Sequence, residues 1–343
     1  MRFGIISTGM ISGEFTRALQ QTPEAEITAV QSRSLENAQA FIEDHQLSAL
    51  AFTSVEELCG SEQVDAVYIA SPNSLHASHA LTAISAGKHV VVEKPAVWNP
   101  AQWDQVFAAA QQAKVLVFEA ARHIYEPAHE IIREALASQT PATVRMNFSQ
   151  YSSRWDAVLA GEEPNIFSLK FGGGALVDLG IYPVYNAVSW FGEPDGINYY
   201  PAVTPTGVDS AGTLILTYED FNVIITIAKN AHSTAPSEIL LGKETIRFSS
   251  CAGIDRVTRY SKDSEEVLFD SGAEIGSRPL SELMRDEAAF FTEMLSAFQQ
   301  GTQTDEQIAT YRRLTLLSRS VNEICTQARN GAGIFFEGET TEF

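Results

Sequence analysis

The sequence has few cysteines, no long apolar run and little positive charge. Among its 343 residues only Cys59, Cys251 and Cys325 are cysteines; they lie far apart and form no CxxC pair. A small, odd and scattered set argues against a disulfide framework or a cysteine zinc site, and is typical of a reducing cytosol. The first apolar run, Phe3–Ile6, is too short for a signal peptide, and no stretch is long enough for a membrane helix. We therefore expect a cytoplasmic protein without a membrane segment.

The charge balance limits the classes of partner. The chain carries 23 Lys+Arg against 43 Asp+Glu, a formal net charge of −20. Nucleic-acid binding relies on basic side chains that neutralise phosphates, so this balance disfavours nucleic acid and also an anionic membrane surface. A local pocket for one small anion remains compatible with it. The length suggests about two domains, and an apolar content of 45% is typical of a globular chain.

The first 120 residues alternate short apolar runs with amphipathic segments. Ile11, Phe15, Ala18 and Leu19 recur with a helical period, and Ser34, Ser54 and Asn99 stand where helix N-caps are expected. Alternating strands and helices predict a doubly wound parallel sheet that binds a nucleotide at the carboxyl ends of its strands. The predicted strands are Phe3–Ile6, Ile27–Val30, Val64–Ala70, His89–Val92 and Val115–Phe118.

The second half has a different pattern. A helix is predicted over Pro127–Leu136, and most of the segments after it alternate apolar with polar residues, as Val144, Met146 and Phe148 do. Short strands separated by turns predict a mostly antiparallel sheet in an α+β domain. Its expected strands after the first are Gly212–Tyr218, Asn222–Lys229, Glu238–Leu241, Thr245–Phe248, Arg256–Tyr260 and Glu266–Phe269, followed by helices near Leu280–Phe298 and Asp305–Arg329.

The loop between the first strand and the first helix resembles a dinucleotide fingerprint. That fingerprint wants glycine at positions 7, 9 and 12, and this chain has Ser7, Gly9 and Ser12. A glycine at the central position lets the backbone approach a pyrophosphate, which the helix N-terminus attracts. The alternative is an ordinary strand–turn–helix junction. The candidate cofactor-binding residues here are Thr8, Gly9, Met10 and Ile11.

The end of the second predicted strand lacks the acid that NAD-binding domains place on the ribose. No Asp or Glu occurs between Thr28 and Leu35, where the chain reads Gln31-Ser32-Arg33-Ser34. A serine hydroxyl and an arginine suit a 2′-phosphate, so Ser32 and Arg33 predict NADP rather than NAD. A solvated loop arginine is the alternative.

The segment Glu93-Lys94-Pro95 directly follows a predicted buried strand. A lysine at the carboxyl end of such a strand lies where a nicotinamide would bind, and buried lysines can move protons. An exposed loop lysine is the alternative interpretation. We count Glu93 and Lys94 as cofactor-binding candidates, together with Pro72, Asn73 and His76, which reach the same edge of the sheet.

Metal ligation has little support. His76 and His79 are three residues apart on a predicted helix, a spacing that could present both rings to one ion. No third ligand stands at a suggestive spacing, so we expect no metal site.

The segment from Gly172 to Pro183 combines three glycines with an acid and a tyrosine. The glycines permit close backbone approach, and if the chain is helical from Gly174, Asp178 and Tyr182 share one face. An acid beside a tyrosine on an otherwise apolar helix is unusual, and it favours a catalytic role for the two residues. A buried, hydrogen-bonded Asp with a core Tyr is the alternative.

Taken in this order, the loop from Gly4 to Ser12, the Glu93–Pro95 turn and the segment from Gly172 to Tyr182 resemble the glucose–fructose oxidoreductase, inositol dehydrogenase and MocA (Gfo/Idh/MocA) family. The resemblance implies a Rossmann domain over 1–121, and a substrate-binding and oligomerisation domain over 122–343 built on a large open sheet. It also implies NAD(P)-dependent oxidation or reduction of a sugar, polyol or related carbonyl. A tyrosine at 182, where many members have histidine, is similar to the dimeric dihydrodiol dehydrogenase and NADP-linked xylose dehydrogenase branch.

The resemblance also assigns catalytic roles. Lys94 matches the active-site lysine and Asp178 the family's aspartate. Tyr182 would exchange a proton with the substrate oxygen, Lys94 would lower the tyrosine's pKa or share the oxygen, and Asp178 would orient its neighbours. Which of Tyr182 and Lys94 carries the proton stays open. Arg122, near the position of a family arginine, and Trp155 are weaker candidates for substrate contact.

Three function classes follow. The first is the enzyme, expected to form at least a homodimer through the sheet, where Ile215 and Ile225 with their alternating neighbours offer an uncovered apolar face. The second is a non-catalytic NADP-binding sensor with the same fold. The third is a partner-binding protein that uses the large sheet and has no nucleotide affinity. Retention of Lys94, Asp178 and Tyr182 together favours the enzyme.

Overall fold

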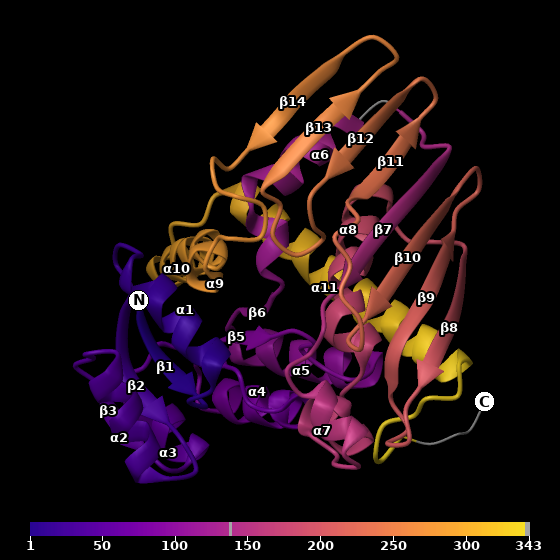
Figure 1. The fold of residues 1–343 in the computed structure, drawn as a ribbon. Helices are drawn as coiled ribbons and strands as arrows, with labels where there is room; N and C mark the ends of the chain where they lie inside the picture. The colour runs from indigo at the N-terminus through magenta and orange to yellow at the C-terminus, as the bar shows by residue number, and fades with distance from the viewer. Residues whose placement is uncertain (137–138, 340–343) are drawn as a thin grey trace. The chain divides into compact units, whose positions relative to one another are not determined.

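The structure is a computed structural model, which describes residues 1–136 and 139–339. It divides into two compact units, each made of two stretches of chain (Figure 1). The first comprises Met1–Arg122 and Pro279–Arg319, and the second comprises His123–Arg278 and Ser320–Phe343. The expected second domain, 122–343, includes residues 137–138 and 340–343, which lie outside the described residues.

The first unit contains a six-stranded parallel sheet in the order β3-β2-β1-β4-β5-β6. This is the strand order of a doubly wound dinucleotide-binding domain, which confirms the predicted fold class. The order reverses between β1 and β4, and ligands bind such sheets at that point. The elements are β1 (Arg2–Ile6), α1 (Met10–Gln20), β2 (Glu26–Gln31), α2 (Leu35–Asp44), β3 (Leu50–Phe52), α3 (Val55–Gly60), β4 (Ala66–Ile69), η1 (Asn73–Leu75), α4 (His76–Ser85), β5 (His89–Glu93), α5 (Pro100–Ala113) and β6 (Val117–Ala120).

Local sequence signals explain most of these boundaries. Ser34, Ser54 and Asn99 each accept a hydrogen bond from the backbone N–H three residues on, as their N-cap assignment predicted. The strand β3 was not predicted, because it has only three residues and lies at the sheet edge. The strand β6 begins two residues later than expected, which places Glu119 inside the strand.

Helices from the end of the chain complete the first unit. They are α9 (Leu280–Leu283), α10 (Arg285–Gln300) and the first part of α11 (Asp305–Gly331). The ring of Phe118 on β6 lies 5.3 Å from that of Phe291 and 5.2 Å from that of Tyr311. Instead of the single helix predicted near Leu280–Phe298, the chain forms two, with Met284 between them.

The second unit is built on an eight-stranded sheet in the order β14-β13-β12-β11-β7-β10-β9-β8, mostly antiparallel as predicted. The pair β7 and β10 is parallel, which requires a long crossover between them. The strand β8 and the short helix α7 were not predicted. The elements are η2 (Arg122–Tyr125), α6 (Pro127–Leu136), β7 (Thr143–Ser149), α7 (Trp155–Leu159), η3 (Asn165–Phe167), η4 (Leu169–Phe171), η5 (Leu176–Gly180), α8 (Ile181–Phe191), β8 (Gly196–Val203), β9 (Asp209–Thr217), β10 (Asn222–Ala228), β11 (Ser237–Leu241), β12 (Glu244–Phe248), β13 (Arg256–Tyr260) and β14 (Glu265–Asp270).

The hairpin register corrects one expectation about this sheet. Ile225 pairs with Leu214, and Ile215 pairs with Ile224. Residues directly opposite each other share a face, so Ile215 and Ile225 lie on opposite faces and the prediction that they form one uncovered face is wrong. Ile225 is fully buried, whereas Ile215 and Ile224 remain partly exposed.

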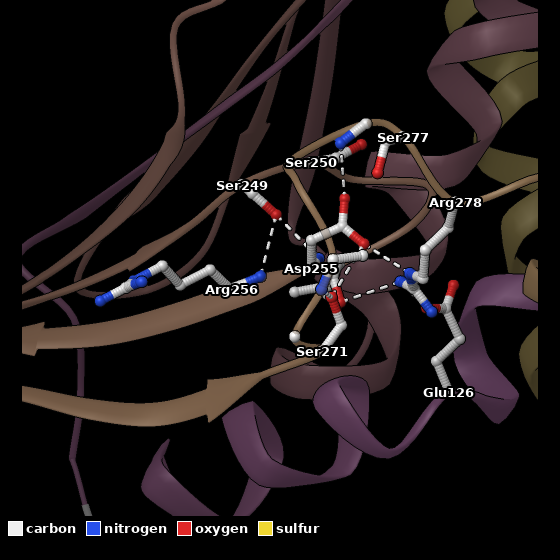
Figure 2. A network of polar contacts seen from close by, with 12 residues as sticks. Glu126, Ser249, Ser250, Asp255, Arg256, Ser271, Ser277 and Arg278 are labelled. Atoms are coloured by element: carbon white, nitrogen blue, oxygen red, sulfur yellow. Dashed lines mark hydrogen bonds and ion pairs between the residues drawn. The ribbon is translucent and has the colours of Figure 1, made fainter.

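A buried ionic network fixes the segment where the chain leaves the second unit. Figure 2 shows Arg278 between Asp255 and Glu126. The guanidinium donates to Asp255 Oδ1 and, over 2.8 Å, to Glu126 Oε2. Asp255 Oδ2 also accepts from the backbone N–H of Gly276. Arg278 is the last residue of its stretch and Glu126 lies four residues into the unit, so the network ties the entry of the chain to its exit.

Candidate active site

The glycine loop between β1 and α1 has the backbone that a dinucleotide requires. Ser7 takes a φ of 87°, a left-handed conformation that explains why glycine is usual at this position. Gly9 is the N-cap of α1, and no side chain caps this helix end. A Cβ built on Gly9 would meet only Ser7 Oγ, at 3.9 Å, so the backbone is open to a close ligand. An uncapped helix N-terminus with open space at its glycine fits a pyrophosphate.

The neighbouring loop after β2 meets this glycine loop. Thr8 Oγ1 donates a hydrogen bond to Ser32 Oγ over 3.3 Å. Ser32 is buried, whereas Arg33 is exposed at the start of the next turn. The structure therefore brings the residues predicted for the pyrophosphate and for the ribose phosphate to one edge of the sheet. Of the remaining candidates there, Met10 is 70% exposed and Ile11 is half-buried.

The turn that carries Lys94 is held by buried polar groups from three elements. The backbone N–H of Lys94 donates to Glu93 Oε2, and the Tyr68 hydroxyl on β4 donates to Glu93 Oε1 over 2.5 Å. The backbone N–H of Ala96 donates to Glu119 Oε1 on β6 over 2.9 Å. Glu93 and Glu119 are both nearly inaccessible. The chain around Lys94 is therefore fixed on both sides of the lysine.

His76 holds the same turn. Its Nδ1 lies 2.8 Å from the carbonyl oxygen of Pro95 and its Nε2 2.8 Å from that of Ser71. Burial lowers the pKa of His76 to about 4, so the ring is neutral near pH 7 and donates to one of these carbonyls. Burial raises the pKa of Glu93. Pro72 and Asn73, the other candidates at this edge, are half-buried just before α4.

Asp178 lies on a π-helical turn, η5, that continues into α8. The segment is helical as predicted, although the π geometry was not expected. Turns of π-helix are rare, and those that occur often lie at functional sites. Asp178 Oδ2 accepts a 2.6 Å hydrogen bond from the ammonium of Lys229, which is 2% exposed. The carboxylate is itself 35% exposed.

Two of the preceding glycines are required by close contacts with the chain itself. A Cβ on Gly173 would lie 2.5 Å from the carbonyl carbon of Ile166. A Cβ on Gly174, whose φ is +126°, would lie 2.2 Å from Asp209 Oδ1. Asp209 accepts hydrogen bonds from the backbone N–H of Leu176 and from the Tyr199 hydroxyl. The glycines therefore let buried groups anchor the start of η5.

Tyr182 follows one turn later and is mostly buried. Its ring centroid lies 4.9 Å from that of His123 and 5.5 Å from that of Phe148. The backbone carbonyl of Tyr182 accepts from His123 Nε2 over 3.2 Å, which assigns the proton to that nitrogen. Asp178 and Tyr182 thus lie on one continuous helical segment.

The two weaker candidates have different surroundings. Trp155 begins α7 and packs on Phe167, with 5.4 Å between their centroids. The ammonium of Lys229 lies 4.6 Å from the centre of the Phe167 ring, so Trp155 is connected to Asp178 through two side chains. Arg122 is half-buried at the end of the first stretch of chain, and its charge acts on Glu93.

Residues 1–136 and 139–339 contain no candidate metal site and no candidate membrane-spanning helix. No three side chains of His, Cys, Asp or Glu gather there in an arrangement that could hold a metal ion. None of the helices in these residues combines the length and the apolar character needed to cross a membrane.

Sequence reasoning missed four polar residues that support these groups: Tyr68, Glu119, Asp209 and Lys229. Glu119 and Lys229 had a detectable signal, since each is a charged residue at the end of an otherwise apolar run. Tyr68 and Asp209 have ordinary sequence surroundings, and only the fold brings them to their partners.

Comparisons with protein-family models agree with the fold and the motifs. Residues 1–121 match the model described as "Oxidoreductase family, NAD-binding Rossmann fold". Residues 129–246 match the model of the GFO/IDH/MocA C-terminal domain.

Individual proteins match over most of the chain. The uncharacterized oxidoreductase YgjR of Escherichia coli is 32% identical over 100% of this chain and 99% of its own length. The NADP(+) scyllo-inositol 2-dehydrogenase IolU of Bacillus subtilis is 36% identical over 77% of this chain and 80% of its own. Among solved structures, the 3-ketoreductase KijD10 of Actinomadura kijaniata, in complex with NADP and TDP-benzene, superimposes with a TM-score of 0.77 at 22% identity, covering 96% of this chain and 97% of its own.

Proposed function

We propose, because this chain belongs to the Gfo/Idh/MocA family of NAD(P)-binding oxidoreductases, that it moves a hydride between NADP(H) and a carbon bearing a hydroxyl or carbonyl oxygen. The substrate class is a sugar, a polyol or a related small molecule. IolU, whose name specifies NADP and scyllo-inositol, supports both the cofactor and the class. Ser32 and Arg33, in place of an acid after β2, support NADP independently.

The fixed turn at Lys94 carries the proposal. The buried side chains of Glu93, Glu119 and His76 form hydrogen bonds with the backbone of residues 94–96. Burying polar groups is costly unless they are paired, so a turn supported in this way indicates a required position for the lysine. The lysine directly follows β5 at the carboxyl edge of the sheet, where such folds bind their ligands.

The roles of the residues follow from their chemistry. When bound, the nicotinamide cofactor supplies the hydride donor or acceptor. The N-terminus of α1 with Gly9 would hold the pyrophosphate, and Ser32 and Arg33 the 2′-phosphate. Lys94 Nζ and Tyr182 Oη would hold and transfer the proton of the substrate oxygen, and Asp178 would orient its neighbouring groups. The proposal leaves open which of the two carries the proton in the chemical step.

A reducing compartment suits the chain, and we propose that it acts in the cytoplasm. Cys59, Cys251 and Cys325 are buried, and no disulfide joins them in the described residues. Burial raises the pKa of Cys59 to about 11 and that of Cys251 to about 12. Thiols of this kind form little thiolate and are inert structural groups.

The test is turnover with a panel of polyols, aldoses, ketoses, dicarbonyls and dihydrodiols, followed through NADPH absorbance. We expect NADPH to exceed NADH as cofactor. The variants Lys94→Ala and Tyr182→Phe should each lower turnover by about 10²–10⁴-fold, while NADPH fluorescence titrations show that the cofactor still binds. The matched control is Tyr200→Phe, at a 63% exposed tyrosine of the same unit, which should keep wild-type turnover.

Each alternative has its own result. If Tyr182→Phe retains full turnover, Tyr182 is a core residue and the proton is carried by Lys94 or by water. NADPH binding without turnover of any compound would favour the sensor. Absence of nucleotide binding would favour the partner-binding protein.

A further inference from the structure

Lys229 is a buried cation of the second unit, and its backbone is fixed in the sheet. It directly follows β10, its N–H donates to the carbonyl of Ser210, and its carbonyl accepts from the N–H of Ser152. Its side chain is 2% exposed. The backbone of Lys229 therefore moves only together with the sheet, and its buried side chain extends from a fixed position.

Three partners surround this ammonium. Nζ lies 2.6 Å from Asp178 Oδ2, 3.3 Å from the carbonyl oxygen of Ile166, and 4.6 Å from the centre of the Phe167 ring. Within residues 1–136 and 139–339, only Asp178 offers a full opposite charge at hydrogen-bond distance. A buried ammonium without such a partner is strongly destabilising, so the position of Asp178 and the burial of Lys229 depend on each other.

A second acid faces the ammonium but is already engaged. Asp209 on β9 is 3% exposed; burial raises its pKa, and the charge of Lys229 acts in the opposite direction. Its Oδ2 accepts from the Leu176 N–H and from the Tyr199 hydroxyl of β8. Tyr182 and Tyr185 on α8 are the other titratable groups of the helical segment that carries Asp178. Of the two carboxylates, Asp178 forms the ion pair with Lys229 and keeps part of its surface exposed.

We propose that Lys229 is a positioning residue of the reaction: it holds the Asp178 side chain in place on η5 and keeps it ionised. This inference rests on the proposed function, since it gives Lys229 a role through Asp178. Lys229 needs no contact with substrate or cofactor. The tie from Nζ to the Ile166 carbonyl extends the same constraint to η3, where Phe167 supports Trp155.

The first test compares pH profiles of wild type and Lys229→Met, a variant of similar length without charge. A carboxylate that loses its cation takes up a proton more easily, so the acid limb of the kcat profile should move to higher pH by about one unit or more. Turnover on that limb then falls about tenfold or more, while NADPH affinity stays unchanged. The control is Lys243→Met, at an exposed lysine of the β11–β12 turn, which should keep the wild-type profile.

Two further variants separate positioning from simple packing. Lys229→Arg keeps the charge and should restore the acid limb toward its wild-type position. In an Asp178→Asn background, Lys229→Met should cause little additional loss, because the group through which it acts is gone. A full, multiplicative loss in that background would overturn the proposal, as would a Lys229→Met profile identical to wild type.

The second test needs no turnover. Urea unfolding of wild type, Asp178→Asn, Lys229→Met and the double variant measures the pair as a cycle. Asp178→Asn leaves a buried ammonium unpaired, so the double variant should be more stable than Asp178→Asn alone. If it is equally or less stable, the proposal fails. This cycle also decides the case in which Lys229→Met alone does not fold, since removing the second charge should then restore folding.

Failure of this inference is distinct from failure of the proposed function. An active wild type with an impaired Asp178→Asn and a normal Lys229→Met rejects the inference and keeps the function. An inactive wild type with a cooperative stability cycle rejects the function and shows the pair to be structural only, which also rejects the positioning role.

Discussion

Several buried polar side chains in this protein hold the backbone next to a candidate reactive group. Glu93, His76 and Glu119 hold the turn around Lys94. Asp209 holds the start of the helical segment that bears Asp178. Such groups must be paired to be tolerated, and pairing them with main-chain atoms gives rigidity where catalysis needs position. The residues around the proposed chemistry are therefore as informative as the proposed catalytic residues themselves.

A residue-scale prediction concerns the cofactor. Arg33 is exposed beside Ser32, at the place where a 2′-phosphate would bind. A charge-assisted contact is worth about 1.5–3 kcal/mol, so Arg33→Ala should weaken NADPH binding roughly 10- to 150-fold and NADH binding far less. Fluorescence titration with both nucleotides measures this. Arg312→Ala, at an exposed arginine of α11, should change neither. Equal losses for both nucleotides, or tighter wild-type binding of NADH, would contradict the prediction.

The sequence was informative about residues whose function depends on position in a motif. Gly9, Lys94 and Asp178 stand at fixed places relative to predicted elements, so spacing alone identified them as candidates. Lys229 and Asp209 act through partners about 50 and 33 residues away in the chain, and no local pattern encodes such a meeting. Ile225 was assigned to the wrong face because the hairpin register depends on the turn, and an offset of one residue reverses the face.

At the scale of elements, His89 joins β5 to the chain that leads into β6. Its Nδ1 accepts a hydrogen bond from the backbone N–H of Leu116 over 3.0 Å. Burial lowers the pKa of His89 to about 4, and the charge of Asp65 opposes this only weakly. The ring is therefore neutral in the folded protein at pH values where an unfolded histidine is already protonated.

We predict that this neutral ring makes the free energy of unfolding depend on pH. The unfolded state binds more protons than the folded state between about pH 6.5 and pH 4, so the free energy of unfolding falls as pH falls through that window. His89→Asn keeps an acceptor for Leu116 and removes the titration. Between pH 7 and pH 5 the free energy of unfolding should therefore fall less for this variant than for the wild type, by on the order of 2 kcal/mol.

Urea unfolding at fixed pH values measures this difference. His232→Asn, at an exposed position of the second unit, serves as the control and should follow the wild-type curve. Parallel curves for His89→Asn and wild type would show that His89 does not contribute to the acid sensitivity.

At the scale of the molecule, alternating strands and helices predicted the first sheet, and short strands separated by turns predicted the second. The two strands that were missed are short or at an edge: β3 has three residues, and β8 is an edge strand of the large sheet. The parallel pairing of β7 with β10 could not be predicted, since neither strand differs in pattern from an antiparallel one.

The face of the large sheet that carries Ile215 and Ile224 supports a prediction about assembly. These two residues are paired and partly exposed, and Tyr200 on the same face is 63% exposed. Because exposed apolar groups on a sheet favour association, we expect at least a homodimer at micromolar concentration. Ile224→Glu should shift sedimentation toward the single chain, whereas Leu159→Glu, on exposed α7, should not. A wild-type protein that sediments as one chain would contradict the prediction.

The split composition of the first unit has a consequence for how the protein is made. Its sheet is complete at Arg122, but the helices that cover Phe118 come from Pro279–Arg319, about 160–200 residues later. At a synthesis rate of about 5–20 residues per second, the nascent sheet waits about 10–40 s for them. Throughout that interval the ring of Phe118 in the ribosome-bound chain is not yet covered by these helices. The first unit, although it begins at Met1, is therefore finished only when Arg319 has been translated, shortly before the second unit receives Ser320–Phe343.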